Sequence, residues 1–191
     1  LFDFSQKFID EYFPYCIEMA RAFVQPKYQS AQMGRKALFA LDNLWDGIGG
    51  IVATNPDVKY LSGKVTIYSS SPELSRKAMV YYLDKHFGDR EGLITSKNPE
   101  RWTDEQAEMF EDMFIGANYK ENYQILNNYV KSMGDTIPPL IHSYIGLSET
   151  MKTFGTTFDP DFGDCYDTAM MITIADIYKE KHDRYIGSYE A

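Results

Sequence analysis

The clearest hydrophobic pattern in the chain covers residues 33–54, where apolar residues recur every three or four positions. That spacing puts them on one face of a helix, which we expect to end before Asn55-Pro56. Short apolar runs rich in β-branched and aromatic residues predict strands over 15–24, 58–68 and 168–174. Helical spacing with start and stop signals predicts further helices over 5–13, 71–87, 103–114, 120–133 and 138–147.

The order of these elements indicates the α/β class. Strands and helices alternate early in the chain, which favours some parallel strand pairing. A chain of 191 residues is long enough to bury its own core. We therefore expect a single domain spanning 1–191.

Composition narrows the function classes. The formal net charge of -9 disfavours binding to nucleic acid or to an anionic membrane. Cys16 and Cys165 are too few for a disulfide framework or a zinc site, so we expect reduced thiols in the cytoplasm. The three histidines lie far apart without ligand spacing, and we predict no metal site.

Charge is distributed unevenly near the N-terminus. Residues 19–41 hold Arg21, Lys27, Arg35 and Lys36 and no acidic residue, although the chain as a whole is acidic. Arg35 and Lys36 fall at the start of the predicted helix, where free N–H groups attract anions. This segment is either a phosphate site or an ordinary solvated face.

The strand predicted over 15–24 carries an acid and a base among apolar residues. Side chains alternate along a strand, so Glu18 and Arg21 face opposite sides. Charged groups in such a strand are costly unless they pair or serve a cleft. Glu18 is therefore either part of a structural ion pair or a general base near the end of the strand.

Three ordered motifs resemble one family. They are Glu18-x-x-Arg21-x-x-Val24 with Pro26-x-Tyr28 and Gly34-Arg35, then Ile137-Pro138-Pro139-Leu140-Ile141-x-x-Tyr144-x-x-Leu147, then Asp159-Pro160-Asp161-Phe162-Gly163 before the last strand. Together they resemble GNAT-fold acyltransferases. More narrowly, they resemble the hemolysin-like N-acyltransferases that make ornithine and glycine lipids, and more distantly the acyl-homoserine-lactone synthases.

The resemblance implies a fold and a site. The fold would be a mixed sheet with flanking helices, splayed between the strands over 15–24 and 58–68, and the pantetheine arm of the acyl donor would enter the splay. The loop over 24–35 and the following helix start would hold its phosphate. The residues expected there are Val24, Lys27, Gln29, Gly34, Arg35 and Lys36.

The resemblance also implies catalytic roles. Glu18 would take the proton of the attacking amine, and Arg21 would orient Glu18 or the carboxylate of the acceptor. Tyr81, in the pattern Ala78-x-x-Tyr81, would protonate the leaving thiolate; the alternative is a tyrosine that only packs.

The implied enzyme is an N-acyltransferase that moves a long acyl chain from a phosphopantetheine thioester to an amino acid. Acyl carrier protein or CoA would carry the donor, no cofactor would be tightly bound, and glycine or ornithine would be the acceptor. A short-chain acetyltransferase using acetyl-CoA and a non-catalytic binding protein stay open as alternatives. Peripheral contact with the inner membrane would involve Phe2, Phe4 and Phe8.

Three departures from the family pattern stand out. The phosphate loop has one glycine, Gly34, which is compatible with a carrier-protein donor. Residues 90–135 resemble a helical insertion, either a lid over an acyl channel or simply packing. The strands that precede Glu18 in GNAT chains do not fit into residues 1–14, so we expect the gene product to begin before Leu1.

Overall fold

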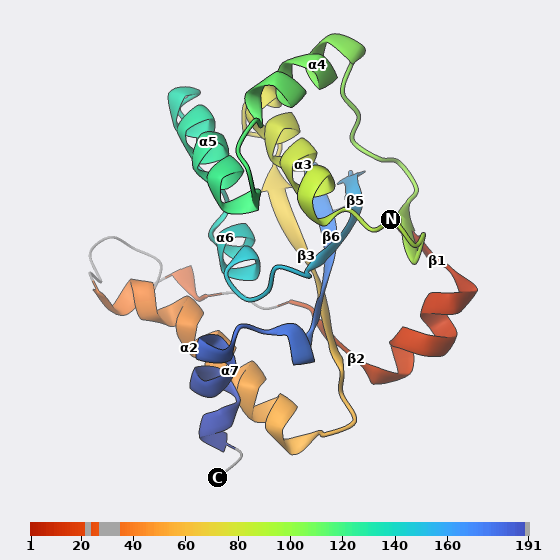
Figure 1. Ribbon diagram of the computed structural model, residues 1–191, viewed down its shortest axis with the longest axis vertical. Coiled ribbons are helices and arrows are strands. Elements are labelled where there is room, and N and C mark those ends of the chain that lie inside the picture. The colour runs from red at the N-terminus through yellow and green to blue at the C-terminus, as the bar shows by residue number, and fades with distance from the viewer. Residues whose placement is uncertain (22–23, 27–34, 190–191) are drawn as a thin grey trace.

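The computed structural model describes residues 1–21, 24–26 and 35–189 (Figure 1). The described strands are β1 (Phe2–Phe4), β2 (Cys16–Met19), β3 (Tyr60–Tyr68), β4 (Ile94–Ser96), β5 (Lys152–Asp159) and β6 (Cys165–Thr173). The described α-helices are α2 (Arg35–Thr54), α3 (Glu73–Phe87), α4 (Asp104–Met113), α5 (Tyr119–Ser132), α6 (Pro139–Ile145) and α7 (Lys179–Tyr185). Shorter helical turns are η1 (Phe8–Tyr12), η2 (Phe13–Tyr15), η4 (Ile174–Asp176) and η5 (Gly187–Tyr189).

The main sheet has the strand order β2-β3-β6-β5. β2 pairs with β3 in parallel, whereas β6 is antiparallel to both β3 and β5. β1 and β4 form a separate antiparallel pair. The predicted fold class, a mixed α/β sheet with flanking helices, is confirmed, and this arrangement is consistent with a GNAT-like fold.

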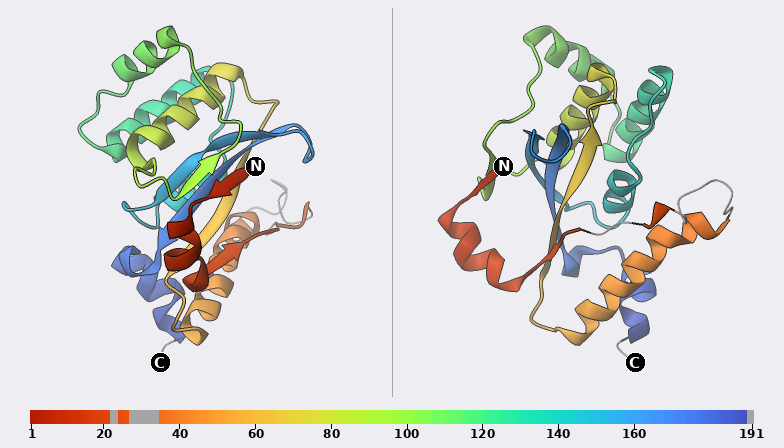
Figure 2. Two further views of the ribbon diagram at one scale, coloured as in Figure 1. Left: turned by 90° about the vertical axis from the view of Figure 1, so that its right-hand side faces the viewer. Right: turned by 180° about the vertical axis from the view of Figure 1, so that it is seen from behind.

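One face of the sheet carries the main core. Leu61, Val65 and Ile67 of β3 alternate toward this face and are at most 2% exposed. They share one cluster of buried residues with side chains from α2, α3, α5, α6 and α7. Figures 1 and 2 show α2, α5 and α6 on this side of the sheet, with the N-terminal helical turns on the other side.

The opposite face is only partly covered. A smaller cluster joins Phe8 to Leu93 and Ile94 near β4 and to Phe154 and Met171 of the sheet. Phe8 is 2% exposed, so it is not available for the membrane contact predicted for it, whereas Phe4 is 52% exposed. This cluster anchors the N-terminal segment to the sheet.

Several local predictions are confirmed. The helix predicted over 33–54 is α2, and the strand predicted over 58–68 is β3. The Thr103 side chain accepts from the Gln106 backbone N–H while the Gln106 side chain accepts from Thr103, a complete capping box at the start of α4. Gly134 follows α5 with a φ of +74°, the left-handed conformation that favours glycine.

The strand predicted over 15–24 is much shorter than expected, because β2 ends at Met19. Arg21 then takes a left-handed backbone conformation, with a φ of +56°. An extended strand cannot continue through that conformation. The side-chain alternation predicted for residues 20–24 is therefore wrong at Arg21.

The sequence pattern did not predict β5, because several of its buried residues are threonines and not apolar residues. Thr153, Thr156 and Thr157 are all at most 2% exposed. The hydroxyls of Thr153 and Thr157 donate to the carbonyls of Leu83 and Asn98. That of Thr156 bonds the hydroxyl of Thr168. Polar residues can be buried where their hydrogen bonds are satisfied, so the polarity of these threonines did not mean that they lie on the protein surface.

The pair β1–β4 was also missed. No strand was predicted within 90–101 or 1–4, yet Ile94–Ser96 pair with Phe2–Phe4, about 90 residues earlier in the sequence. Three-residue strands carry too little pattern to be recognised alone. Residues 1–14 thus hold one strand, which lies outside the main sheet.

The segment over 90–135 packs into the protein. Phe110 of α4 and Leu126 and Val130 of α5 are fully buried in the same cluster as α3 and β3. This agrees with the packing interpretation of the segment. That it also covers an acyl chain stays a prediction.

Candidate active site

The two parallel strands separate at a defined point. The last paired residues are Met19 and Gly63, yet β3 continues for five more residues to Tyr68, and among the described residues these pair with β6 alone. The left-handed Arg21 turns the chain away after β2. This conformation costs a non-glycine residue roughly 1–2 kcal/mol. Among the described residues, the pairing of β2 with β3 therefore ends just beyond Glu18, at the place where the splay was predicted; that the acyl donor enters there stays a prediction. We call this place the opening.

Glu18 faces away from the main core. Its neighbours Ile17 and Met19 pack on the core cluster, so alternation turns Cys16 and Glu18 to the opposite face. Glu18 is exposed and lies beside Ser62 in the strand register. Burial raises the pKa of the Cys16 thiol, and the nearby Glu18 carboxylate adds to the rise. An exposed carboxylate at this edge is accessible to a substrate amine.

Other polar residues of β3 and β6 share this face with Glu18. Lys64 lies two residues beyond Ser62, and its ammonium group is 2.5 Å from a carboxylate oxygen of Asp167. The other oxygen of Asp167 accepts from the Thr66 hydroxyl at 2.7 Å. Asp167 is 1% exposed, whereas the Lys64 side chain is 40% exposed. The opening is thus bordered by a carboxylate on β2 and an anchored ammonium group on β3.

A tyrosine hydroxyl lies on the other side of the opening. A Cβ placed on Gly63 would be 2.9 Å from the Tyr144 hydroxyl oxygen and 3.3 Å from the Met19 carbonyl oxygen. Tyr144 belongs to α6, and its ring packs edge-on against Trp45 at 5.5 Å between centroids. Glycine at position 63 is therefore what lets the hydroxyl approach the diverging strands.

Burial raises the pKa of Tyr144 to about 12. The hydroxyl therefore keeps its proton at neutral pH. Among the described residues it makes no hydrogen bond. A protonated, unengaged hydroxyl can donate to a group that enters the opening. The motif around Tyr144 was singled out from the sequence, but its position at the opening was not.

Tyr81 lies elsewhere. Its hydroxyl donates to Glu111 of α4 at 2.5 Å, and its ring packs against Trp102, Phe110 and Phe114. Burial and the bond to Glu111 raise its pKa to about 12. The structure therefore brings Tyr81 to the contact between α3 and α4, not to the face that carries Glu18.

The predicted phosphate-binding residues are covered only in part. Lys27, Gln29 and Gly34 lie outside the described residues, and Val24 is in the short described stretch 24–26. Arg35 and Lys36 are the first two residues of α2, and their side chains lie outside the description. That this end of α2 binds the phosphate stays a prediction.

Within 1–21, 24–26 and 35–189, no three ligand-type side chains come together to hold a metal ion. Over the same residues, no helix combines the length and the apolar character that a membrane span requires.

Two curated proteins resemble the chain over almost all of its length. One, from Phocaeicola vulgatus, is 45% identical over 190 residues, which is 99% of this chain and 58% of that protein. The other, from Bacteroides thetaiotaomicron, is 43% identical over 189 residues, 99% of this chain and 56% of that protein. Both are named glycine N(alpha)-acyltransferase.

The chain therefore spans a little over half the length of these relatives. No protein-family model matches it. No solved structure matches it either. The relatives' names agree with an N-acyltransferase, and they do not refer to a hemolysin or to ornithine.

Proposed function

We propose that the chain is part of an N-acyltransferase that transfers a long acyl chain from a phosphopantetheine thioester to the amine of glycine. The observation that carries this proposal is the similarity to two glycine N(alpha)-acyltransferases over 99% of the chain. The opening between β2 and β3, with Glu18 at its edge, supports the same reaction. Ornithine, the second acceptor considered from the sequence, has no such support.

In the proposed reaction the amine attacks the thioester carbonyl directly. The new C–N bond forms as the C–S bond breaks, Glu18 takes a proton from the amine, and the thiolate leaves with a proton. General base assistance contributes typically 10²–10⁴-fold to such a step. A backbone N–H at the diverging strand end would stabilise the carbonyl oxygen as charge develops there.

The proton for the thiolate has two candidate donors. We favour Tyr144 over Tyr81, because its hydroxyl is beside Gly63 at the opening. Glu18 is on the opposite face of the sheet from Tyr144. A thioester in the opening would then have a base on one side and an acid on the other.

Two cations could recognise the carboxylate of glycine. Arg21 lies two residues beyond the end of β2, and Lys64 of β3 lies on the same face of the sheet as Glu18. A guanidinium suits bidentate binding of a carboxylate, and Arg21 would alternatively orient Glu18. In the proposed site either residue would supply positive charge for the acceptor carboxylate.

The acyl donor is proposed to be carried by acyl carrier protein or CoA, in the cytoplasm. The basic residues of 19–41 would bind the phosphate and, for a carrier protein, its acidic surface. Peripheral contact with the inner membrane would involve Phe4, which is exposed, and not Phe8.

The test is lipid mass spectrometry on cells that express the full-length gene, beside a Glu18→Ala variant and a Glu149→Ala control. Glu149 is an exposed acid away from the opening. We expect a new N-acylglycine in the wild-type and control cultures and none in the Glu18→Ala culture. A short-chain acetylated amine would instead support the acetyltransferase alternative. No new product from well-expressed protein would overturn the proposal in favour of a non-catalytic role.

A further inference from the structure

Lys64 is the first residue of β3 beyond its pairing with β2, so it borders the opening. Its partner in the register of β6 is Ala169, whose small side chain leaves room for the lysine to cross that strand diagonally. The ammonium group there meets the carboxylate of Asp167, which is paired with Thr66 in the register. Lys64 thus joins the opening to a buried acid on the next strand.

Asp167 holds this ammonium group in place. Its side chain is 1% exposed, and its two oxygens are engaged separately, one by Lys64 at 2.5 Å and the other by the Thr66 hydroxyl at 2.7 Å. Burying a carboxylate is costly even when it is paired, so stability by itself does not account for this arrangement. The pair does fix the position of the lysine, and a fixed cation is what precise recognition of a ligand needs.

The ammonium group keeps donors for a ligand. It has three N–H groups, and Asp167 is its one hydrogen-bond partner within the described residues. The Lys64 side chain is 40% exposed, whereas Asp167 is closed to solvent, so a ligand at the opening meets the cation and not the acid behind it. A carboxylate matches such donors. Arg21 has no comparable anchor in the part of the chain that the structure describes.

Glu18 and Lys64 leave the same face of the sheet. Glu18 lies beside Ser62, and Lys64 is two residues farther along β3, so standard strand spacings put their Cα atoms roughly 8 Å apart. In glycine a single carbon joins the amine to the carboxylate, so one molecule can meet both side chains. We propose that Lys64, positioned by Asp167, binds the carboxylate of glycine while Glu18 takes the proton of its amine. This assignment rests on the proposed acyl transfer.

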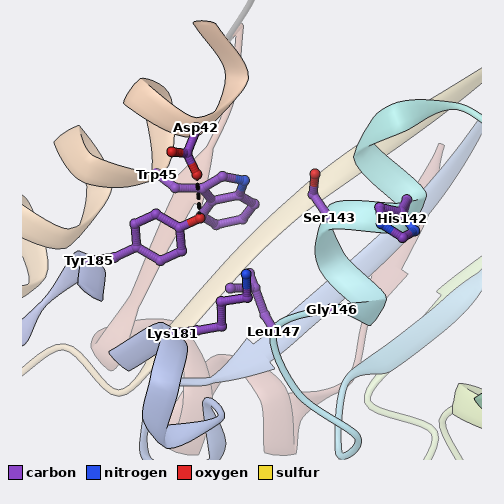
Figure 3. A pocket seen from close by; sticks show the side chains of 8 residues that line it. All are labelled: Asp42, Trp45, His142, Ser143, Gly146, Leu147, Lys181 and Tyr185. Atoms are coloured by element: carbon purple, nitrogen blue, oxygen red, sulfur yellow. Dashed lines mark hydrogen bonds between the residues drawn. The ribbon is translucent and has the colours of Figure 1, made fainter. Parts of the chain in front are cut away.

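The cleft on the core side of the sheet does not offer this combination. It lies between α2, α6 and α7, and the carboxylate of Asp42 lines it together with Lys181 (Figure 3). The oxygens of Asp42 accept from the Tyr185 hydroxyl at 2.6 Å and from Arg184, so this acid ties α2 to the C-terminal helix. Glu18 points to the opposite face of the sheet and cannot serve an amine bound there.

The test compares glycine with glycinamide, an acceptor that lacks the carboxylate. We would measure kcat and KM of the full-length protein for both acceptors, with palmitoyl-CoA and palmitoyl-acyl carrier protein as donors. Lys64→Met should raise KM for glycine at least about tenfold and leave KM for glycinamide within about twofold, because glycine alone loses a charge-assisted hydrogen bond. A merely structural role for Lys64 would change both values alike.

Further variants separate position from charge. Asp167→Asn leaves the lysine charged but unanchored, so it should raise KM for glycine severalfold and spare glycinamide. Combining Lys64→Met with Asp167→Asn leaves no unpaired buried carboxylate and should show the same selective loss as Lys64→Met. The control is Lys97→Met, at an exposed lysine paired with Asp3 outside the main sheet, which should change neither KM.

Equal changes for the two acceptors, in both Lys64→Met and the double variant, would overturn the assignment and make the ion pair structural. Thermal unfolding would confirm that each variant is folded. Wild-type protein that acylates neither acceptor would overturn the proposed function and this assignment with it. The two failures are distinguishable, because the first leaves the wild-type product intact.

Discussion

β3 borders two regions that differ in almost every physical respect. Toward its end, Val65 and Ile67 are at most 1% exposed beneath α3 and α5, paired on one side with β6. At its middle, Gly63 leaves room for a hydroxyl, and β2 stops pairing. The first region follows the rules of stability, since it buries apolar surface and satisfies its hydrogen bonds.

The second region departs from those rules. It combines an interrupted strand pair, a left-handed arginine, an exposed carboxylate and the hydroxyl of the buried Tyr144, which makes no hydrogen bond among the described residues. Each of these costs stability or adds none. Such departures concentrate where a protein acts on a ligand, which is why we place the reaction here and not in the tightly packed half.

The largest expected effect tests whether the packed half is one cooperative unit. Leu126 of α5 is 0% exposed, so Leu126→Ala should lower the free energy of unfolding by about 2–5 kcal/mol. Ile115→Ala, at a side chain 79% exposed, should change it by less than about 0.5 kcal/mol. Chemical denaturation of both variants measures this. A small loss for Leu126→Ala would show that α5 is a loosely attached cover and not part of the core.

A pair of tyrosine variants sharpens the contrast between the regions. Tyr144→Phe should lower kcat by about 10²-fold, the low end for proton transfer, and change the free energy of unfolding by under about 1 kcal/mol. Tyr81→Phe should leave kcat unchanged, because the opening stays intact. It should instead lower the free energy of unfolding, because it removes the hydrogen bond to Glu111. Steady-state kinetics and chemical denaturation of both variants measure these two effects. Loss of turnover in Tyr81→Phe alone would return the proton donor role to Tyr81.

How far the sequence predicts this molecule follows the same division. The helix α2 and the strand β3 carry long periodic patterns, and both were predicted nearly to their ends. β5 was missed because its buried threonines are satisfied by partners such as Leu83 and Asn98, which no local pattern indicates.

Sequence reasoning singled out candidate site residues only where a family motif falls on a predicted strand. Glu18 was singled out as a candidate because a charged residue in an apolar strand is conspicuous. The position of Tyr144 beside Gly63 was not, since the two are 81 residues apart in sequence and meet only after α6 packs on the sheet. The end of β2 depends on the backbone conformation of Arg21, and arginine gives no signal for a left-handed turn.

The smallest effect is expected where an exposed ion pair joins the N-terminal segment to the sheet. Glu91 accepts from Lys152 of β5 and from Lys7 at 2.6 Å, and these bonds lower the pKa of Glu91 to about 2. The pKa of Glu91 is therefore lower in the folded state than in the unfolded state, where it is near 4.3. The ionised carboxylate stabilises the fold at a pH above about 4.3, and this contribution is lost as the pH falls toward 2.

Because the Glu91 side chain is 38% exposed and solvent screens its ion pairs, Glu91→Gln should cost under about 1 kcal/mol at pH 7. Denaturation at pH 7 and near pH 2 should show the difference from wild type shrinking to zero, and added salt at pH 7 should also reduce it. A difference that is independent of pH would mean that Glu91 acts through packing and not through its charge. That result would show that the N-terminal segment belongs to the packed region, and the comparison between the two regions would then have to include it there.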